Sequence, residues 1–310
     1  MPTTDTAAPP SVSIVIVTYN SAEVISTCLT SISRESRALH VETLVVDNGS
    51  QDGTPELIQS RFPSVQVITG HGNVGFAAGN HIGFRKSSGH YILMLNPDTQ
   101  IQTGALLDLI NCTHAHPKAG MIAPRLINSD GSLQHSTFRF PDFRQAVFGF
   151  FEKLVPIDSP QNGRYSVEAY AQSRVVDHIV GAAIFFRREM LWQTGGMDEN
   201  YNLYYEETDW CYRAKHAGWQ LLYTPEATIM HQGAHTTSKN HEASSVMFAQ
   251  SQSYFYRKNY GWPHYVVLKV ITIVGLSYWL SRSIYGLLRC RISTGTFMKR
   301  LKSYSLILLS

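Results

Sequence analysis

Three acidic side chains within four residues form one candidate catalytic group. Glu206, Glu207 and Asp209 stand at the expected start of a helix. Acids there also complement the helix dipole, and Asp209 is placed to pair with Arg213 one turn later. The aromatic segment 201–205 would partly desolvate the two glutamates, which raises a carboxylate pKa and suits a general base. The sequence therefore predicts Glu206 or Glu207 as a base, whereas helix pairing accounts for Asp209.

Asp98 and His231 are the candidate ligands for a metal ion. Asp98 follows an apolar strand and Pro97, so its carboxylate would project from the strand end. Capping of a following helix and binding of a divalent cation that bridges a diphosphate explain it equally well. His231 ends the apolar run 227–230 and is either a core histidine or an imidazole ligand beside an aspartate. Both alternatives stay open at this point.

The elements that would position these residues alternate between strands and helices. Short β-branched runs, as in buried parallel strands, are followed by segments of helical pattern. The expected strands are 12–17, 43–46, 65–69 and 91–95, and the expected helices are 21–33, 54–62 and 76–87. This alternation predicts an α/β fold with a mostly parallel central sheet flanked by helices. Ligands bind at the carboxyl ends of such strands, where the chain carries small polar loops.

The second half of the chain is less regular. We expect a long excursion over the site at 128–174, a strand at 178–188 and a turn at Gly195-Gly196. The segment 70–75 spells G-x-G-x-x-G, but two strand–helix units precede it, so it matches a dinucleotide-binding fingerprint weakly. Tight turns explain its glycines better.

Composition and charge exclude several classes of protein. The 310 residues are 44% hydrophobic and 16% charged, unlike a disordered chain, a coiled coil or collagen. Four scattered cysteines and a polar N-terminus fit a reducing compartment. From Arg257 onward there are nine Lys and Arg residues and no acid, which leaves 17 basic against 23 acidic residues before it.

This basic tail contains the most apolar window of the chain, residues 265–288. Lys269 and Arg282 interrupt the window, which favours a helix lying on an anionic membrane surface over one that spans the bilayer. A helix packed on the domain is the third possibility. The apolar content of the tail argues against a nucleic-acid partner.

Six ordered motifs resemble the family 2 glycosyltransferases, most closely their bacterial rhamnosyltransferase-like branch. They are VSIVIVTYNS, LVVDNGSQDGT, GNVGFAAGNHIGF, YILMLNPDT, GGMDENYNLYYEETDWCYRAKHAGW and IMHQGAHT. The resemblance covers about residues 11–260 and implies the GT-A fold, with a nucleotide-binding half at 11–100 and an acceptor and catalytic half at 101–260. Residues 1–10 would be a disordered N-terminus and 261–310 a basic, apolar, membrane-associating tail.

The resemblance also implies a set of site residues. Those expected to contact the nucleotide-sugar are Thr18, Tyr19, Asn20, Asp47, Asn48, Asn73, Gly75, Asn80, Asn96, Asp98, Gly181 and Ala182. Asp98 and His231 would hold Mg²⁺ or Mn²⁺, and Glu206 or Glu207 would be the base. Asn96 stands where the family pattern has the first acid of D-x-D, and Glu207 stands where it usually has Asp.

The implied activity is an inverting, metal-dependent transfer of a sugar onto a lipid-linked glycan in cell-surface polysaccharide synthesis. The resemblance implies rhamnose from dTDP-rhamnose as the donor, at the cytoplasmic face of the bacterial inner membrane. The alternatives are a UDP-linked donor carrying galactofuranose, N-acetylglucosamine or galactose, a non-catalytic glycan-binding relative, and an NAD-dependent dehydrogenase.

Overall fold

The computed structural model describes residues 11–36, 39–151, 162–233 and 241–309. Its strands are β1 (Val12–Thr18), β2 (Val41–Asp47), β3 (Gln66–Ile68), β4 (Tyr91–Leu95), β5 (Thr99–Ile101), β6 (Ala119–Ile127), β7 (Leu133–Gln134), β8 (Thr137–Phe138), β9 (Arg174–Val175), β10 (His178–Ile179), β11 (Ala183–Arg187) and β12 (Gln220–His231). Its helices are α1 (Ile25–Glu35), α2 (Thr54–Arg61), α3 (Phe76–Lys86), α4 (Ala105–Ala115), α5 (Phe143–Phe150), η3 (Val167–Ala171), α6 (Arg188–Thr194), α7 (Glu206–His216), α8 (His241–Phe255), η4 (Tyr256–Tyr260), α9 (Trp262–Leu288) and α10 (Thr294–Leu309).

The first half of the chain forms the expected parallel unit. Strands β3, β2, β1 and β4 lie side by side in that order, and every pairing among them is parallel. The helical and strand segments expected from the sequence are confirmed, although α1 begins at Ile25 after a turn that starts at Ser21. The carboxyl ends of these four strands therefore meet at one edge of the sheet.

Antiparallel strands enter the sheet in its second half. The order continues through β11, β6, β12 and β5, with β11 antiparallel to both of its neighbours. The single strand expected at 178–188 is wrong: β10 pairs with β8 in a separate small sheet, and β11 starts anew at Ala183. Residues 180–182 lie between these two strands, and they reach the carboxyl edge of the sheet because Ala183 pairs with Leu95 at the end of β4.

Alternating strand residues pack against helices on both faces of the sheet. On one face, Ile14 and Ile16 of β1 join a core that includes residues of α1, α2 and α4. On the other face, Val15 joins residues of α3, α6 and α7, including the fully buried Trp210. Because side chains alternate along a strand, these two cores account for the continuous apolar runs of the sequence.

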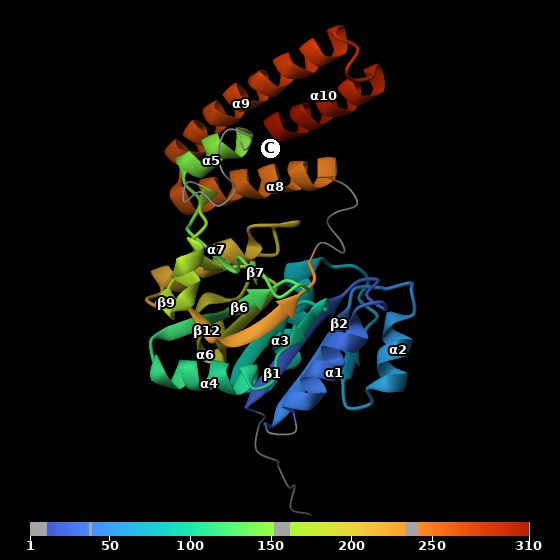
Figure 1. Cartoon of the computed structure of the whole chain (residues 1–310), viewed down its shortest axis with the longest axis vertical. Helices are drawn as coiled ribbons and strands as arrows, with labels where there is room; N and C mark the ends of the chain where they lie inside the picture. The colour runs from blue at the N-terminus through green and yellow to red at the C-terminus, as the bar shows by residue number, and fades with distance from the viewer. Residues whose placement is uncertain (1–10, 37–38, 152–161, 234–240, 310) are drawn as a thin grey trace, which may run out of the picture.

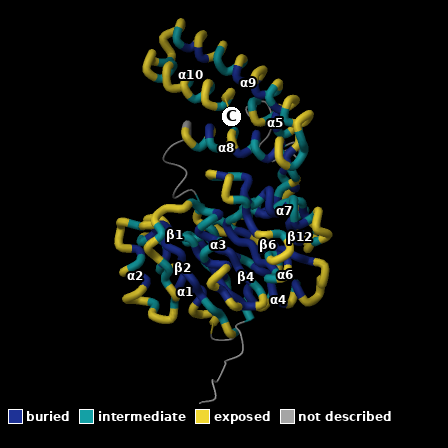
Figure 2. Tube along the Cα trace, turned by 180° about the vertical axis from the view of Figure 1, so that it is seen from behind, coloured by how far each residue is buried: buried dark blue, intermediate teal, exposed yellow. Residues whose placement is uncertain are grey.

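Helices α5, α8, α9 and α10 lie beyond the carboxyl edge of the sheet (Figure 1). Helix α9 packs against α5 and η4, and α10 folds back against α9 and α8. The segment 128–174, expected as an irregular excursion, contains short strands and the α5 helix within its described residues. Figure 2 shows that burial is concentrated around the sheet, whereas α9 and α10 are largely exposed or half-buried. The division of the chain at residue 260 stays a prediction.

Candidate active site

The loop after β2 is held to the end of β1 by one buried carboxylate. Asp47 accepts a hydrogen bond from the Thr18 hydroxyl at 2.9 Å, and its other oxygen accepts the backbone N–H groups of Gly49 and Ser50. Both Asp47 and Thr18 are buried. These two predicted site residues therefore fix the conformation of the loop after β2 from inside the protein.

A second set of contacts joins this loop to the glycine-rich segment before α3. The Asn48 side-chain amide donates to the Gly75 carbonyl at 3.0 Å, and its oxygen lies 3.2 Å from His71 Nε2. Gly49 passes close to Gly72, and the φ angles of these two glycines are +82° and +67°. The glycines thus permit the left-handed turns that bring the two loops together, which supports the turn interpretation of the G-x-G-x-x-G pattern.

The remaining predicted contact residues of this half differ in exposure. Tyr19, Asn20 and Asn73 are exposed at the carboxyl edge. Asn80 is buried within α3, where its amide group donates to the Phe76 carbonyl at 2.9 Å. The exposed residues can meet a ligand directly, whereas Asn80 supports the first turns of α3.

Asp98 and His231 are brought together from distant parts of the chain. Strand β5, which follows Asp98, pairs antiparallel with the end of β12, and His231 Nε2 lies 3.3 Å from Asp98 Oδ1. The capping alternative for Asp98 is wrong, because a strand rather than a helix follows it. The two candidate ligands therefore share one half-buried position at the sheet edge.

Gln134 of β7 sets the orientation of the His231 ring. Its amide nitrogen donates to Asn128 Oδ1 at 3.0 Å, so its oxygen faces His231 Nδ1 at 2.7 Å. Through that contact Nδ1 can donate to the Gln134 oxygen, which leaves Nε2 on the side of the Asp98 carboxylate. A carboxylate oxygen and an imidazole nitrogen that face one another in this way suit a divalent cation.

The described residues contain no cluster of three His, Cys, Asp or Glu side chains with metal-binding geometry. A cation at Asp98 and His231 would therefore take its other ligands from phosphate oxygens and water, which is how Mg²⁺ is commonly held at phosphate sites. The residues present fit such an ion.

The small residues at the break before β11 connect the candidate metal ligands to the acidic pair. The Asn96 N–H donates to the Ala182 carbonyl at 2.9 Å. A Cβ placed on neighbouring Gly181 would lie 3.8 Å from the Glu207 carboxyl carbon and 3.6 Å from the Phe76 ring. The absence of a side chain at Gly181 thus leaves space beside the Glu207 carboxyl group.

The acidic pair is held where water has little access. Glu206 is 5% exposed, Glu207 is half-buried, and the Oε2 atom of each is buried with no hydrogen-bond partner among the described residues. Burial, and then the neighbouring Glu207 charge, raise the pKa of Glu206 to about 8. Burial also raises the pKa of Glu207, against backbone hydrogen bonds that include one from Gly181. The expected desolvation of the two glutamates is confirmed.

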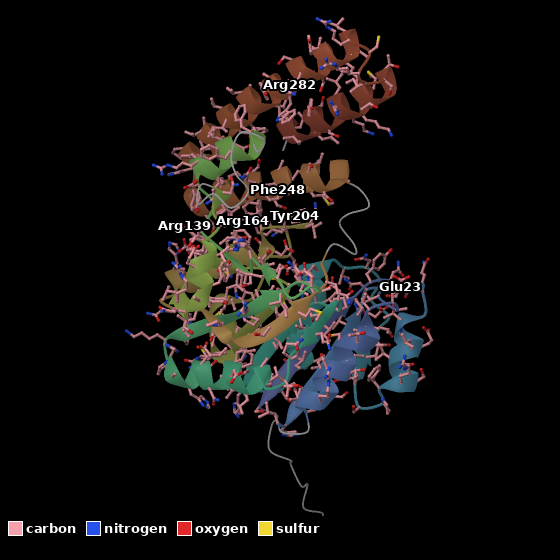
Figure 3. The ribbon with its side chains drawn as sticks, in the orientation of Figure 1. Glu23, Arg139, Arg164, Tyr204, Phe248 and Arg282 are labelled. Carbon is pink, nitrogen blue, oxygen red and sulfur yellow. The ribbon has the colours of Figure 1, made fainter. Side chains whose placement is uncertain are left out.

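Strained backbone and an aromatic cluster fix the start of α7. Tyr204 and Tyr205 have φ angles of +66° and +68°, a conformation that costs on the order of 1–3 kcal/mol for such residues and is typical of functional sites. Both rings contact Phe248 of α8 edge-on, and Tyr205 also packs on Phe255. Phe248 lies on α8, and Tyr204 lies on the side of α8 that faces the sheet (Figure 3). The α8 helix therefore holds the glutamates in position.

Asp209 has the structural role expected from the sequence. Its carboxylate pairs with Arg213 at 2.8 Å, as predicted, and also with Lys258 at 2.9 Å. Asn259 adds a hydrogen bond at 2.8 Å. This fully buried carboxylate thus anchors the η4 segment to α7.

Replacement of Glu206 should stabilise the protein at alkaline pH. Because its pKa is raised from 4.5 to about 8, the folded chain binds more protons than the unfolded chain between these pH values, and its stability falls as the pH rises through that range. We expect Glu206→Gln to raise the melting temperature by at least roughly 2 °C at pH 9, and by less at pH 5. Thermal unfolding at both pH values measures this, with Glu23→Gln as an exposed control. An equal shift at the two pH values would contradict it.

Reasoning from the sequence missed Gln134 and Phe76. Gln134 lies in a segment without periodicity, and only the pairing of β7 with β6 brings it to His231. Phe76 reads as the first core residue of α3, and its contact with Gly181 depends on the break before β11. No local signal identifies either residue.

Comparison with known proteins places this chain among carbohydrate-modifying enzymes. The model of a family described as "Glycosyl transferase family 2" matches residues 13–195. The N-acetylglucosaminyl-diphospho-decaprenol L-rhamnosyltransferase of Mycobacterium tuberculosis is 28% identical over 80% of this chain and 87% of its own length. Rhamnosyltransferase WbbL of Escherichia coli is 25% identical over 72% of this chain and 83% of its own length.

Solved structures of other proteins superpose on nearly the whole chain. The mannosyltransferase PcManGT of Pyrobaculum calidifontis, solved with GDP-Man and Mn²⁺, superposes with a TM-score of 0.58 at 15% identity, over 97% of this chain and 88% of its own. This likeness concerns the fold.

Proposed function

Because the chain belongs to glycosyl transferase family 2, we propose that it transfers rhamnose from dTDP-rhamnose to a lipid-linked glycan during cell-surface polysaccharide synthesis. The chain is a glycosyltransferase with the GT-A fold. The names of its mycobacterial and Escherichia coli relatives support rhamnose as the sugar, and the mycobacterial name supports a diphospholipid acceptor. The observation that carries the proposal is the buried glutamate pair beside Gly181, next to the strand end that bears Asp98.

Glu207 is the better candidate for the base. Its carboxyl group lies beside Gly181 and the residue is half-buried, whereas Glu206 is 5% exposed and its pKa of about 8 keeps it protonated at neutral pH. The charge of the neighbouring Glu207 is one cause of the raised pKa of Glu206. An ionised carboxylate at the acceptor side is what removal of a hydroxyl proton requires.

The reaction proceeds in one displacement. The acceptor oxygen bonds to the anomeric carbon as the bond from that carbon to the donor diphosphate breaks, and the hydroxyl proton passes to Glu207. Attack from the face opposite the leaving group inverts the anomeric centre. Asp98 and His231 would hold Mg²⁺ or Mn²⁺, which supplies charge neutralisation for the departing diphosphate. The loops at Asp47 and Gly75 form the floor under the nucleoside, with Tyr19, Asn20 and Asn73 exposed above it.

Titration of nucleotides tests the donor. We expect dTDP to bind about tenfold or more tightly with Mn²⁺ than without it, because phosphate oxygens complete the shell of the cation. We also expect dTDP to bind more tightly than UDP, because the proposed donor is dTDP-rhamnose. Isothermal titration calorimetry of dTDP, UDP and NAD, each with and without Mn²⁺, measures this. Preference for UDP would replace the rhamnosyl donor by a UDP-linked galactofuranose, N-acetylglucosamine or galactose donor. Binding of NAD alone would contradict the transferase site.

We further propose that α9 associates with the cytoplasmic face of the inner membrane, where a lipid-linked acceptor lies. One helix in the described part of the chain, Trp262–Leu288, is long and apolar enough to cross a bilayer. Its outer face presents exposed apolar side chains at helical spacing. They are Val266, Val267, Val270, Ile273, Val274, Ile284, Tyr285 and Leu288, which we call the α9 stripe. The exposed serines Ser277 and Ser281 separate the two parts of the stripe. Exposed apolar side chains on a helix that carries basic residues and no acid are typical of membrane contact.

Charged substitutions in the α9 stripe should release the protein from vesicles. Val270 and Val274 are 56% and 59% exposed, so Val270→Glu/Val274→Glu removes lipid contact with little effect on packing. We expect at least about a tenfold loss of vesicle binding in flotation assays, since burial of two valines is lost and two charges are added. The matched control is Leu107→Glu/Trp192→Glu, which charges exposed apolar residues on α4 and α6. An equal loss in the control would contradict the role of the stripe.

A further inference from the structure

A cationic cavity lies between α9 and α10. It has a volume of about 580 Å³ and is lined by Arg282 of α9, Arg291 of the connecting turn and Arg300 of α10. Trp279 and Tyr285 form its aromatic walls. The cavity therefore collects three guanidinium groups from three separate segments.

The turn between the two helices positions Arg291 at this cavity. The Arg291 N–H donates to the Gly286 carbonyl at 2.8 Å, and Cys290 has a φ angle of +52° in the position where a helix usually ends with glycine. Opposite the turn, Arg300 donates to the Ser283 hydroxyl at 3.3 Å, which ties α10 to α9. The cavity is thus built by the hairpin itself.

Among the residues that the structure describes, the three arginines have no carboxylate partner. No Asp or Glu occurs in the sequence after Glu242, and none of the ion pairs in the described ranges involves Arg282, Arg291 or Arg300. Their close neighbours are aromatic: Arg282 lies over the Tyr278 and Trp279 rings, and Arg291 lies over the Tyr285 ring. Three like charges around one cavity repel one another, so an anion that binds there is favoured. Guanidinium groups match phosphate oxygens in geometry and charge.

The position of the cavity favours a phosphate that belongs to a lipid. Tyr285 is both a wall of the cavity and a member of the α9 stripe, so the cavity opens beside the proposed lipid-facing surface. Arg282 lies well away from Tyr204 and Phe248 near the acidic pair (Figure 3). The hairpin of α9 and α10 lies farther from the sheet than α8, whose residues contact the start of α7 (Figure 1).

We propose that this cavity is a binding site for the phosphate of an anionic membrane lipid, separate from the reacting acceptor. The proposal rests on the membrane association proposed above but not on the identity of the donor sugar. Arg282, Arg291 and Arg300 contact the phosphate oxygens, while the α9 stripe contacts the acyl chains. Basic pockets between helices next to a bilayer bind lipid headgroups in this way.

Vesicle binding of the full-length chain tests the site. Flotation compares vesicles of phosphatidylcholine alone with vesicles that contain phosphatidylglycerol, for the wild type, R282Q/R291Q/R300Q and the control R289Q/K299Q/K302Q. The control removes the same charge from tail residues that do not line the cavity. We expect about a tenfold loss of binding to phosphatidylglycerol vesicles in the cavity variant and less than about a threefold loss in the control. The reason is that direct hydrogen bonds from guanidinium groups to a phosphate contribute more to binding than the unspecific attraction of the basic tail to an anionic surface. Equal losses in the two variants would overturn the proposal.

A second variant and a second ligand complete the test. R282K/R291K/R300K keeps the charge but loses the planar fork, and we expect it to lose phosphatidylglycerol selectivity as well; full retention overturns the site. Hydrogen exchange over residues 279–300 should slow with phosphatidylglycerol vesicles and not with inorganic phosphate alone. If inorganic phosphate alone slowed the exchange, the proposal that the bound phosphate belongs to a lipid would be wrong. Binding of dTDP with Mn²⁺ should be unchanged in all variants, so failure of the donor proposal would appear there and leave the vesicle result intact.

Discussion

Glu207→Gln should abolish sugar transfer while the protein still binds its nucleotide. The substitution keeps the size of the side chain and its place beside Gly181 but removes the proton acceptor. Loss of a general base costs about 10²–10⁴ in rate, so we expect kcat to fall within that range. The dissociation constant of the nucleotide should change little, because the Asp98 and Asp47 side of the site is untouched. Single-turnover transfer assays and calorimetry measure the two quantities separately.

Glu206→Gln is the matched control for this prediction. It removes the neighbouring carboxyl group, whose pKa of about 8 already keeps it neutral at pH 7. We therefore expect Glu206→Gln to retain most of its transfer activity at neutral pH. If Glu206→Gln is inactive and Glu207→Gln is active, the base is Glu206. If both variants keep full turnover, neither residue is the base.

Asp98→Asn should remove the effect of Mn²⁺ on nucleotide binding. The amide keeps the shape of the side chain but loses the charge that faces His231 at 3.3 Å. Loss of one of two protein ligands, and of the charged one, should weaken Mn²⁺ binding at least about a hundredfold and reduce transfer by a similar factor. Electron paramagnetic resonance of free Mn²⁺ measures the affinity directly. Asp130→Asn, in an exposed turn, is the control with the same change of charge.

Gln134→Ala separates ligand orientation from ligation at the same position. Gln134 touches the Nδ1 side of His231 and leaves the Nε2 side open toward Asp98. Loss of such an orienting contact costs about 10- to 100-fold in metal affinity. We expect His231→Ala to cost at least as much as Gln134→Ala. Unchanged Mn²⁺ affinity in both Asp98→Asn and His231→Ala would rule out this pair as the metal site.

The parallel half of the fold was predictable because its signals are local. Runs such as 12–17 and 91–95 are apolar and β-branched, and each is bounded by polar turns. The positions of these strands along the chain therefore follow from the sequence alone. The strand predicted at 178–188 was wrong because an apolar run does not reveal a break. The small residues Gly181 and Ala182 leave the sheet there to reach the catalytic edge.

The chemistry of the residue types identified the candidate site residues, but the sequence did not predict how these residues are arranged in space. Glu206 and Glu207 follow an aromatic segment, which by itself predicted their raised pKa, and the resemblance to a family placed Asp98 and His231 in one site. The contact of His231 with Gln134, and of Gly181 with Glu207, arises from strands that pair across long stretches of chain. Loop lengths and side-chain packing decide such pairings, and neither has a local pattern.

By itself, the sequence determined the α/β class, the strand–helix order of the first half, the acidic pair and the basic apolar tail, because periodicity, turn residues and charge are properties of neighbouring residues. Only the tertiary structure decided which glutamate faces Gly181, that Asp98 meets His231, and that α9 and α10 enclose a cavity lined by three arginines. These features depend on the packing of segments distant in sequence, which is set by the free energy of the whole fold rather than by any one segment.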